Sequence, residues 1–135
     1  MTFACCRLLP LLVLAIPLAA CGRSGPAYDL PPGIYGQVVD MTTTLGFSPQ
    51  TVTIQAGEAV LWRNQSLFAH TVTFDPAQAD DRADVALPVG VEPFGSGDIP
   101  QGETFARKFT VPGAYRYICR RHQDANMEGT IIVTP

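Results

Sequence analysis

Apolar and polar residues alternate in short stretches through most of the chain. In the segment 51–55, Val52 and Ile54 stand between polar residues, and in the segment 59–63 the alternation brings Val60 and Trp62 to one side. Such alternation is typical of strands with one buried face, and it places Trp62 in the core. No window shows a helical period. The predicted strands are 37–43, 51–55, 59–63, 70–74, 104–110, 114–119 and 130–134, which indicates an all-β sandwich of about seven or eight strands.

The segment 75–102 lacks this alternation. Charged residues gather between Asp80 and Asp84, and glycine and proline recur from Pro88 to Pro100. These residues favour turns and interrupt regular strands. We therefore expect a long surface loop that contains a short helical turn.

The first 33 residues resemble an export signal followed by a linker. An uncharged segment, 8–20, follows Arg7 and is short for a membrane span but suits a secretory signal. The sequence LAAC, which ends at Cys21, resembles the bacterial lipoprotein processing site, whereas an ordinary signal would leave Cys21 as a free thiol. We expect a cleaved signal at 1–20, lipidation of Cys21, a flexible tether at 21–33 and one domain at 34–135. The protein would then lie outside the cytoplasm, anchored to a bacterial membrane on its periplasmic side or at the cell surface.

The charge and the cysteine content narrow the function. The chain carries a net charge of −3, which becomes −4 if Arg7 leaves with the signal, so a nucleic acid is not expected as a partner. Cys5 and Cys6 would also leave with the signal, and Cys21 would be acylated. Cys119 would then be the only free thiol of the mature protein, which we expect to be a monomer. A single unpaired cysteine is unusual in an exported protein, and a metal bond would protect it from oxidation.

Cys119, His122 and Met127 form a Cys-x2-His-x4-Met motif, and the only other histidine, His70, lies 49 positions upstream of Cys119. Taken singly, each residue has an ordinary explanation as a small buried residue, a hydrogen-bonding side chain or core filler. Together they supply one thiolate, two imidazoles and one thioether on a loop that follows an alternating strand. That ligand set suits a mononuclear copper ion in both of its oxidation states.

Further motifs extend this pattern over most of residues 45–134. They are FSP at 47–49, AG at 56–57, VxWxN at 60–64, HTV at 70–72, FGSG at 94–97, PGxYxYxC at 112–119 and MxGxIxV at 127–133. The chain resembles the cupredoxins, and most of all the plastocyanin and pseudoazurin group. The resemblance implies a Greek-key β-sandwich with a type 1 copper bound by His70, Cys119 and His122 and weakly by Met127. It also implies that the exposed edge of His122 is the electron port.

Two positions depart from the plastocyanin pattern. Thr71 stands where asparagine follows the first ligand histidine, so the hydrogen bond that pins the ligand loop must come from Thr71 or Asn64, or be absent. Arg121 stands where proline precedes the loop histidine. Arg120 and Arg121 are candidates for contact with an acidic redox partner. Alternatively they are solvated, or one of them packs against a carboxylate such as Asp124.

Other functional classes fit the ligand set less well. A copper enzyme would need a second metal centre, and the chain has two histidines in total. A cysteine hydrolase would need an oxyanion site, and zinc would need a stronger fourth ligand than a thioether. We therefore predict a non-enzymatic carrier that shuttles single electrons between membrane-associated redox proteins. A copper chaperone or copper-storage protein that uses the same ligands is the alternative.

Overall fold

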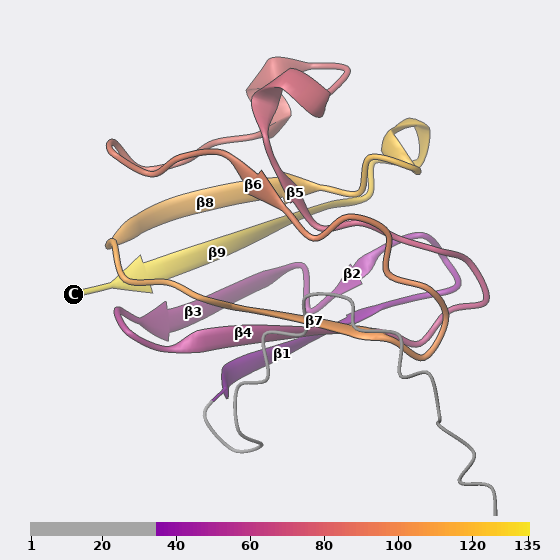
Figure 1. The fold of residues 1–135 in the computed structure, drawn as a ribbon, viewed down its shortest axis with the longest axis horizontal. Helices are drawn as coiled ribbons and strands as arrows, with labels where there is room; N and C mark the ends of the chain where they lie inside the picture. The colour runs from indigo at the N-terminus through magenta and orange to yellow at the C-terminus, as the bar shows by residue number, and fades with distance from the viewer. Residues whose placement is uncertain (1–34) are drawn as a thin grey trace, which may run out of the picture.

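The computed structural model describes residues 35–135, which form nine strands and three short 3-10 turns. The strands pack as two layers (Figure 1). They are β1 (Tyr35–Met41), β2 (Phe47–Ser48), β3 (Thr51–Gln55), β4 (Ala59–Asn64), β5 (Thr73–Phe74), β6 (Phe94–Gly95), β7 (Thr104–Lys108), β8 (Gly113–Ile118) and β9 (Glu128–Thr134). The predicted all-β sandwich is confirmed.

Each layer is a mixed sheet. One sheet has the strand order β2-β1-β4-β7, and the other has the order β3-β9-β8-β5-β6. The pairs β1–β4 and β3–β9 are parallel, whereas the remaining pairs are antiparallel. The chain crosses between the sheets after β2, β3, β4, β6 and β7, so residues far apart in sequence meet at the ends of the sandwich.

Most predicted strands lie where the alternation placed them. The segment 51–55 is β3, and its residues Val52 and Ile54 are buried while their neighbours are exposed. The predicted strand 70–74 is shorter, because only Thr73–Phe74 forms β5, and His70 makes an isolated bridge to Ile99. The two-residue strands β2 and β6 were not predicted, since two residues are too few to show an alternating pattern.

The core is dominated by aromatic rings around Trp62, which is fully buried as predicted. The Trp62 indole packs edge-on to the Tyr117 ring at a centroid distance of 5.5 Å and donates a hydrogen bond to its hydroxyl at 3.1 Å. Burial raises the pKa of Tyr117 well above its usual value, so the phenol stays neutral. Gly129 pairs with Tyr117 across β8 and β9, and a Cβ at Gly129 would lie 2.3 Å from that ring. A side chain at Gly129 would therefore displace a core residue next to the ligand loop.

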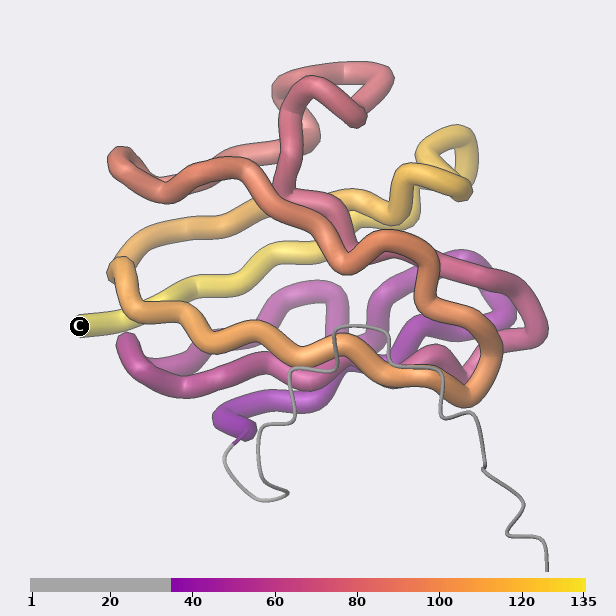
Figure 2. The backbone as a smooth tube through the Cα atoms, viewed as in Figure 1, coloured from indigo at the N-terminus to yellow at the C-terminus, as the bar shows by residue number. Residues whose placement is uncertain are grey.

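The segment between β5 and β6 projects from the edge of the five-stranded sheet (Figure 2). It contains two 3-10 turns, η1 (Pro76–Gln78) and η2 (Arg82–Asp84), where one short helical turn was predicted. The side chains of Asp75 and Asp81 cap these turns by accepting backbone hydrogen bonds from Ala77 and Ala83.

The expected signal at 1–20, Cys21 and the tether at 21–33 lie outside the described residues. Within residues 35–135, no helix is both long enough and apolar enough to cross a membrane.

Candidate metal centre

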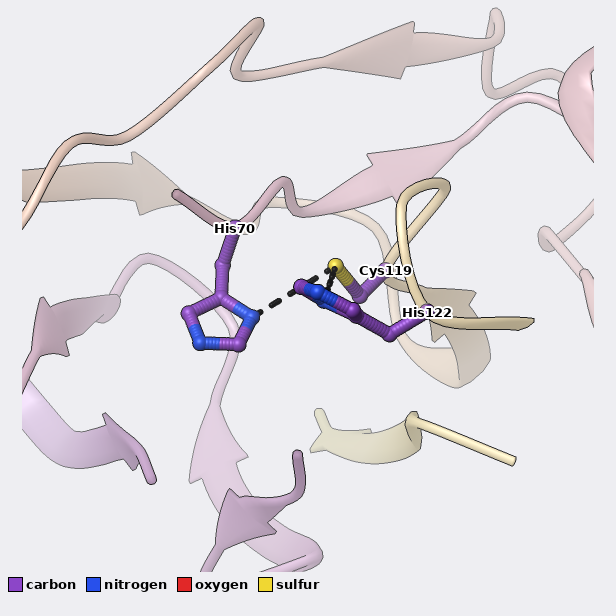
Figure 3. A group of neighbouring side chains, drawn as sticks. All are labelled: His70, Cys119 and His122. Carbon is purple, nitrogen blue, oxygen red and sulfur yellow. Dashed lines mark hydrogen bonds between the residues drawn. The ribbon is translucent and has the colours of Figure 1, made fainter. Parts of the chain in front are cut away.

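Three predicted ligand side chains converge at one end of the sandwich (Figure 3). The Cys119 sulfur lies 3.7 Å from His70 Nδ1 and 3.4 Å from His122 Nδ1. One donor atom from each residue falls within 4.8 Å of the others. His70 and Cys119 are fully buried, and His122 is half-buried. The fold thus brings together residues that are 49 positions apart.

The connection between β4 and β5 carries His70. Asn64 ends β4, and its side-chain amide donates hydrogen bonds to the carbonyl oxygens of Phe68 at 2.7 Å and Ile99 at 2.9 Å. The Asn64 Oδ1 atom accepts hydrogen bonds from the backbone N–H of Ser66 at 2.9 Å and from its hydroxyl at 2.8 Å. Ser66 Oγ also lies 2.7 Å from His70 Nε2. These buried contacts fix the backbone and the imidazole together.

Thr71 joins this connection to the ligand loop. The Thr71 backbone N–H donates to the Cys119 sulfur at 3.4 Å, and the Thr71 hydroxyl lies 4.0 Å from the same atom. The hydroxyl oxygen accepts a hydrogen bond of 2.8 Å from the Arg120 N–H. Thr71 therefore makes the hydrogen bond that pins the ligand loop, whereas Asn64 holds the segment before His70.

The ligand loop runs from Cys119 to Met127 and closes on itself. Its 3-10 turn η3 (Gln123–Ala125) ends at Asn126, which adopts the left-handed conformation with φ of 51°. The Cys119 N–H donates to the Met127 carbonyl at 2.8 Å, and the Met127 N–H donates to the His122 carbonyl at 3.3 Å. This closure places Met127, fully buried, beside Cys119 in the backbone. The structure thus brings all four predicted ligands to one end of the fold.

The electrostatics of the site suit metal binding. Burial, followed by the nearby His122 ring, lowers the pKa of His70 to about 4, so the imidazole is neutral at pH 7. A neutral imidazole keeps a lone pair for a metal ion. The only cysteine in residues 35–135, Cys119, makes no disulfide. The donor set that copper prefers is matched by two imidazole nitrogens, the Cys119 sulfur and the buried Met127 thioether, which lies on the same loop as Cys119.

Arg120 and Arg121 lie on the surface beside this centre and share one carboxylate. Arg121 Nε donates to Asp98 at 2.9 Å, and its Nη2 makes a second bond to the same group. Arg120 Nη2 lies 3.9 Å from Asp98, and its Nη1 donates to Gln78 at 3.3 Å. Arg121 in turn lowers the pKa of Asp98. The carboxylate that meets the arginines is therefore Asp98, which directly precedes Ile99 in the chain, and the three side chains retain one positive charge.

Sequence reasoning missed several supporting residues. Ser66 and Asp98 carried no motif of their own, and neither did Gln123, whose side chain accepts a hydrogen bond of 2.7 Å from the Asp80 N–H. Ser66 stands four positions before His70, a spacing that becomes informative only once the chain between them is known to turn back.

Comparison with known proteins places the chain in a family. Residues 36–134 match the model for copper binding proteins of the plastocyanin/azurin family. Plastocyanin from Scenedesmus fuscus is 38% identical over 101 residues, which cover 70% of this chain and 99% of that protein. Chloroplastic plastocyanin from Tetradesmus obliquus is 39% identical over 93 residues, which cover 66% of this chain and 59% of that protein. The chain belongs to the plastocyanin/azurin family of copper-binding proteins.

Solved structures support the fold. A mutant of amicyanin in its Cu(I) form superposes with a TM-score of 0.59 at 21% identity, covering 78% of this chain and 87% of that chain. A purple cupredoxin from Nitrosopumilus maritimus gives a TM-score of 0.57 at 20% identity, covering 73% of this chain and 99% of that chain. With the family established, the predicted cupredoxin fold, single copper cofactor and blue-copper electron transfer are confirmed.

Proposed function

We propose that His70, Cys119, His122 and Met127 hold the copper ion and that electrons enter and leave through the His122 edge. The observation that carries this proposal is the convergence of two imidazole Nδ1 atoms on one buried sulfur, with Met127 closing the same loop. Copper, when bound to such a set, supplies a one-electron couple in which both oxidation states accept similar geometry. The residues are held in place by the fold, so little has to move on electron transfer.

The surroundings of His122 support its role as the port. His122 is half-buried, whereas His70 and Cys119 are enclosed. The Phe68 ring lies 6.4 Å from the His122 ring and is 50% exposed, and Leu67 beside it is 71% exposed. An apolar surface at this position lets a partner approach the imidazole closely without leaving water trapped between them.

We assign the protein to the carriers, not the enzymes. The described residues bring together one group of candidate metal ligands, and the ligands that it contains are buried or half-buried. Such a centre exchanges electrons but offers a substrate no open position. A chaperone or store that releases copper remains the alternative, and it is distinguished by its preference for Cu(I).

The test is reconstitution of the purified full chain with Cu(II). We expect an intense visible band from thiolate-to-copper charge transfer and reversible one-electron cycling. Substitution of Met127 by Leu should keep the colour and change the reduction potential, because the thioether is the weak ligand. A colourless protein that binds Cu(I) and rejects Cu(II) would favour the chaperone, and a chain that binds neither would contradict the copper assignment.

We further propose that Arg120 and Arg121 contact an acidic redox partner. Their side chains are 49% and 44% exposed, and the pairing with Asp98 leaves one net positive charge beside the port. Attraction of this kind raises association rates and weakens with added salt. Arg120→Ser should slow electron transfer with an acidic partner at low salt. Lys108→Ser is the control and should not slow it, because Lys108 pairs with Ala59, at the end of β4 opposite to Asn64. Equal rates for both variants, insensitive to salt, would contradict steering.

The N-terminal proposal rests on the sequence alone. We propose that Cys21 is lipidated after cleavage of 1–20, which would tether the domain by residues 21–33 to a bacterial membrane, on its periplasmic side or at the cell surface. In this position the carrier would serve membrane-associated donors and acceptors. Mass spectrometry of the mature N-terminus should show a lipidated Cys21, and Cys21→Ala should release the protein from membranes. An unmodified N-terminus, or unchanged membrane retention in the variant, would contradict this anchor.

A further inference from the structure

We propose that Ser66 is a positioning residue that holds the His70 imidazole in one tautomer, with the proton on Nε2 and the Nδ1 lone pair directed toward the metal. This inference rests on the proposed ligand role of His70. It assigns a function to a side chain that no sequence motif identified.

The two nitrogens of His70 face different surroundings. Nδ1 lies 3.7 Å from the Cys119 sulfur, on the side where His122 also points (Figure 3). Nε2 lies 2.7 Å from Ser66 Oγ. Both His70 and Ser66 have no exposed surface, so water does not compete for either nitrogen. Rotation of the ring by half a turn would put the ring carbons Cδ2 and Cε1 where Nδ1 and Nε2 now lie, so both contacts would be lost and Nδ1 would leave the site.

The direction of the Ser66–His70 hydrogen bond follows from Asn64. Asn64 Nδ2 faces two carbonyl oxygens, those of Phe68 and Ile99, which can only accept. Asn64 Oδ1 must then face Ser66, and it already accepts the Ser66 backbone N–H at 2.9 Å. The amide orientation is therefore fixed at both ends.

The single hydroxyl proton of Ser66 has two acceptors other than His70. Asn64 Oδ1 lies 2.8 Å from Ser66 Oγ, and the Phe68 carbonyl lies 3.0 Å from it. The Phe68 N–H donates to the same Oγ at 3.1 Å. With its proton given to Asn64, Ser66 Oγ has a lone pair that accepts Nε2–H from His70. Asn64, Ser66 and His70 thus form a directional chain of hydrogen bonds that ends at the metal centre.

Groups of this kind set the orientation and basicity of a metal-bound histidine. Loss of such a partner typically lowers metal affinity about 10- to 100-fold. We expect Ser66→Ala to weaken copper binding by that factor, and Ser66→Thr, which keeps a hydroxyl, to restore most of it. Ser96→Ala is the matched control, because Ser96 Oγ accepts the Val72 N–H at 2.9 Å nearby but contacts no imidazole.

The first measurement needs no variant. Two-bond nitrogen–proton correlation NMR of the full chain without copper, at neutral pH, reports the tautomer of His70 directly. We expect the Nε2–H form with a slowly exchanging proton, and the Nδ1–H form would overturn the proposal. This measurement is made without copper, so its outcome does not depend on copper binding. Failure of the parent protein to bind copper would be seen in the reconstitution experiment and would contradict the proposed function, not the tautomer.

The second measurement compares the variants. Chelator competition gives the dissociation constants for Cu(I) and Cu(II), and amide spectra show whether each variant is folded. Weaker binding in Ser66→Ala than in Ser66→Thr and Ser96→Ala supports the assignment. Affinity of Ser66→Ala within about twofold of the parent overturns it. If Ser66→Ala does not fold, the tautomer of the parent and the affinity of Ser66→Thr decide.

Discussion

His70 and His122 face the same sulfur but are held in different ways. The inner segment, residues 64–71, holds His70 through buried hydrogen bonds of Asn64 and Ser66, and its Thr71 N–H donates to the Cys119 sulfur. The ligand loop, residues 119–127, is held on its outer side by exposed groups such as the Arg121–Asp98 pair. Within the described part of the chain, the only hydrogen-bonding contact of the His122 ring is the Cys119 sulfur.

The two regions have different roles in the metal centre. Buried polar networks are costly to break, because a buried polar group that loses its partner cannot form a hydrogen bond with water instead. Exposed ion pairs contribute little, because water replaces them. The inner segment therefore sets the geometry of the centre, and the ligand loop leaves one imidazole near the surface for a partner.

The largest effect is expected where the two regions meet, at Cys119. Cys119→Ser replaces the thiolate that both histidines face, so the visible charge-transfer band should disappear entirely. Absorption spectroscopy after addition of Cu(II) gives the result. A retained band of similar intensity would mean that another residue supplies the sulfur ligand and that Cys119 is not the ligand at which the two regions meet.

The next effect tests the inner segment. Asn64→Ala removes both amide donors and the acceptor for Ser66, so we expect a loss of about 2 to 4 kcal/mol in the free energy of unfolding. Denaturant unfolding of the copper-free protein gives this value. The exposed neighbour Gln65 provides the control, since Gln65→Ala should change it by less than about 0.5 kcal/mol. Equal losses for the two variants would contradict the claim that the buried hydrogen bonds of Asn64 stabilise the protein.

Thr71 tests the link between the two regions. Thr71→Val keeps the shape but leaves the Arg120 N–H without its acceptor, which should cost about 1 to 2 kcal/mol. Hydrogen exchange at the Arg120 amide should accelerate, because the loop is no longer pinned there. Thr71→Ser keeps the hydroxyl and should preserve slow exchange. Fast exchange in the parent protein would show that Thr71 does not hold the loop.

The smallest effect is expected for the outer side of the ligand loop. Asp98→Asn removes the charge that Arg121 meets, and we expect a loss below about 1 kcal/mol and an unchanged visible spectrum. Asp40→Asn is the matched control, because Asp40 makes the same two-bond contact with Arg63 on β1 and β4. A loss above 2 kcal/mol for Asp98→Asn alone would show that this surface pair stabilises the site as strongly as the buried network does.

The alternation of side chains predicted the longer strands well, because one buried face leaves a period of two in the sequence. It predicted β3 at its observed bounds and placed Trp62 in the core. It missed β2 and β6, and the composition of residues 75–102 predicted one helical turn where there are two. These elements are too short to carry a pattern, and their positions depend on the strands beside them.

The sequence by itself determined the kind of centre. The donor types and spacing of Cys119, His122 and Met127, together with a distant His70, specify copper because the chemistry of a ligand depends on its atoms and not on the fold. Only the tertiary structure decided how the ligands are held. The order β8-β5-β6 in the five-stranded sheet brings Thr71 to Arg120 and Asp98 to Arg121. The course of the chain between β4 and β5 brings Ser66 to Nε2 of His70. Such contacts depend on distances in space that residue spacing along the chain does not encode.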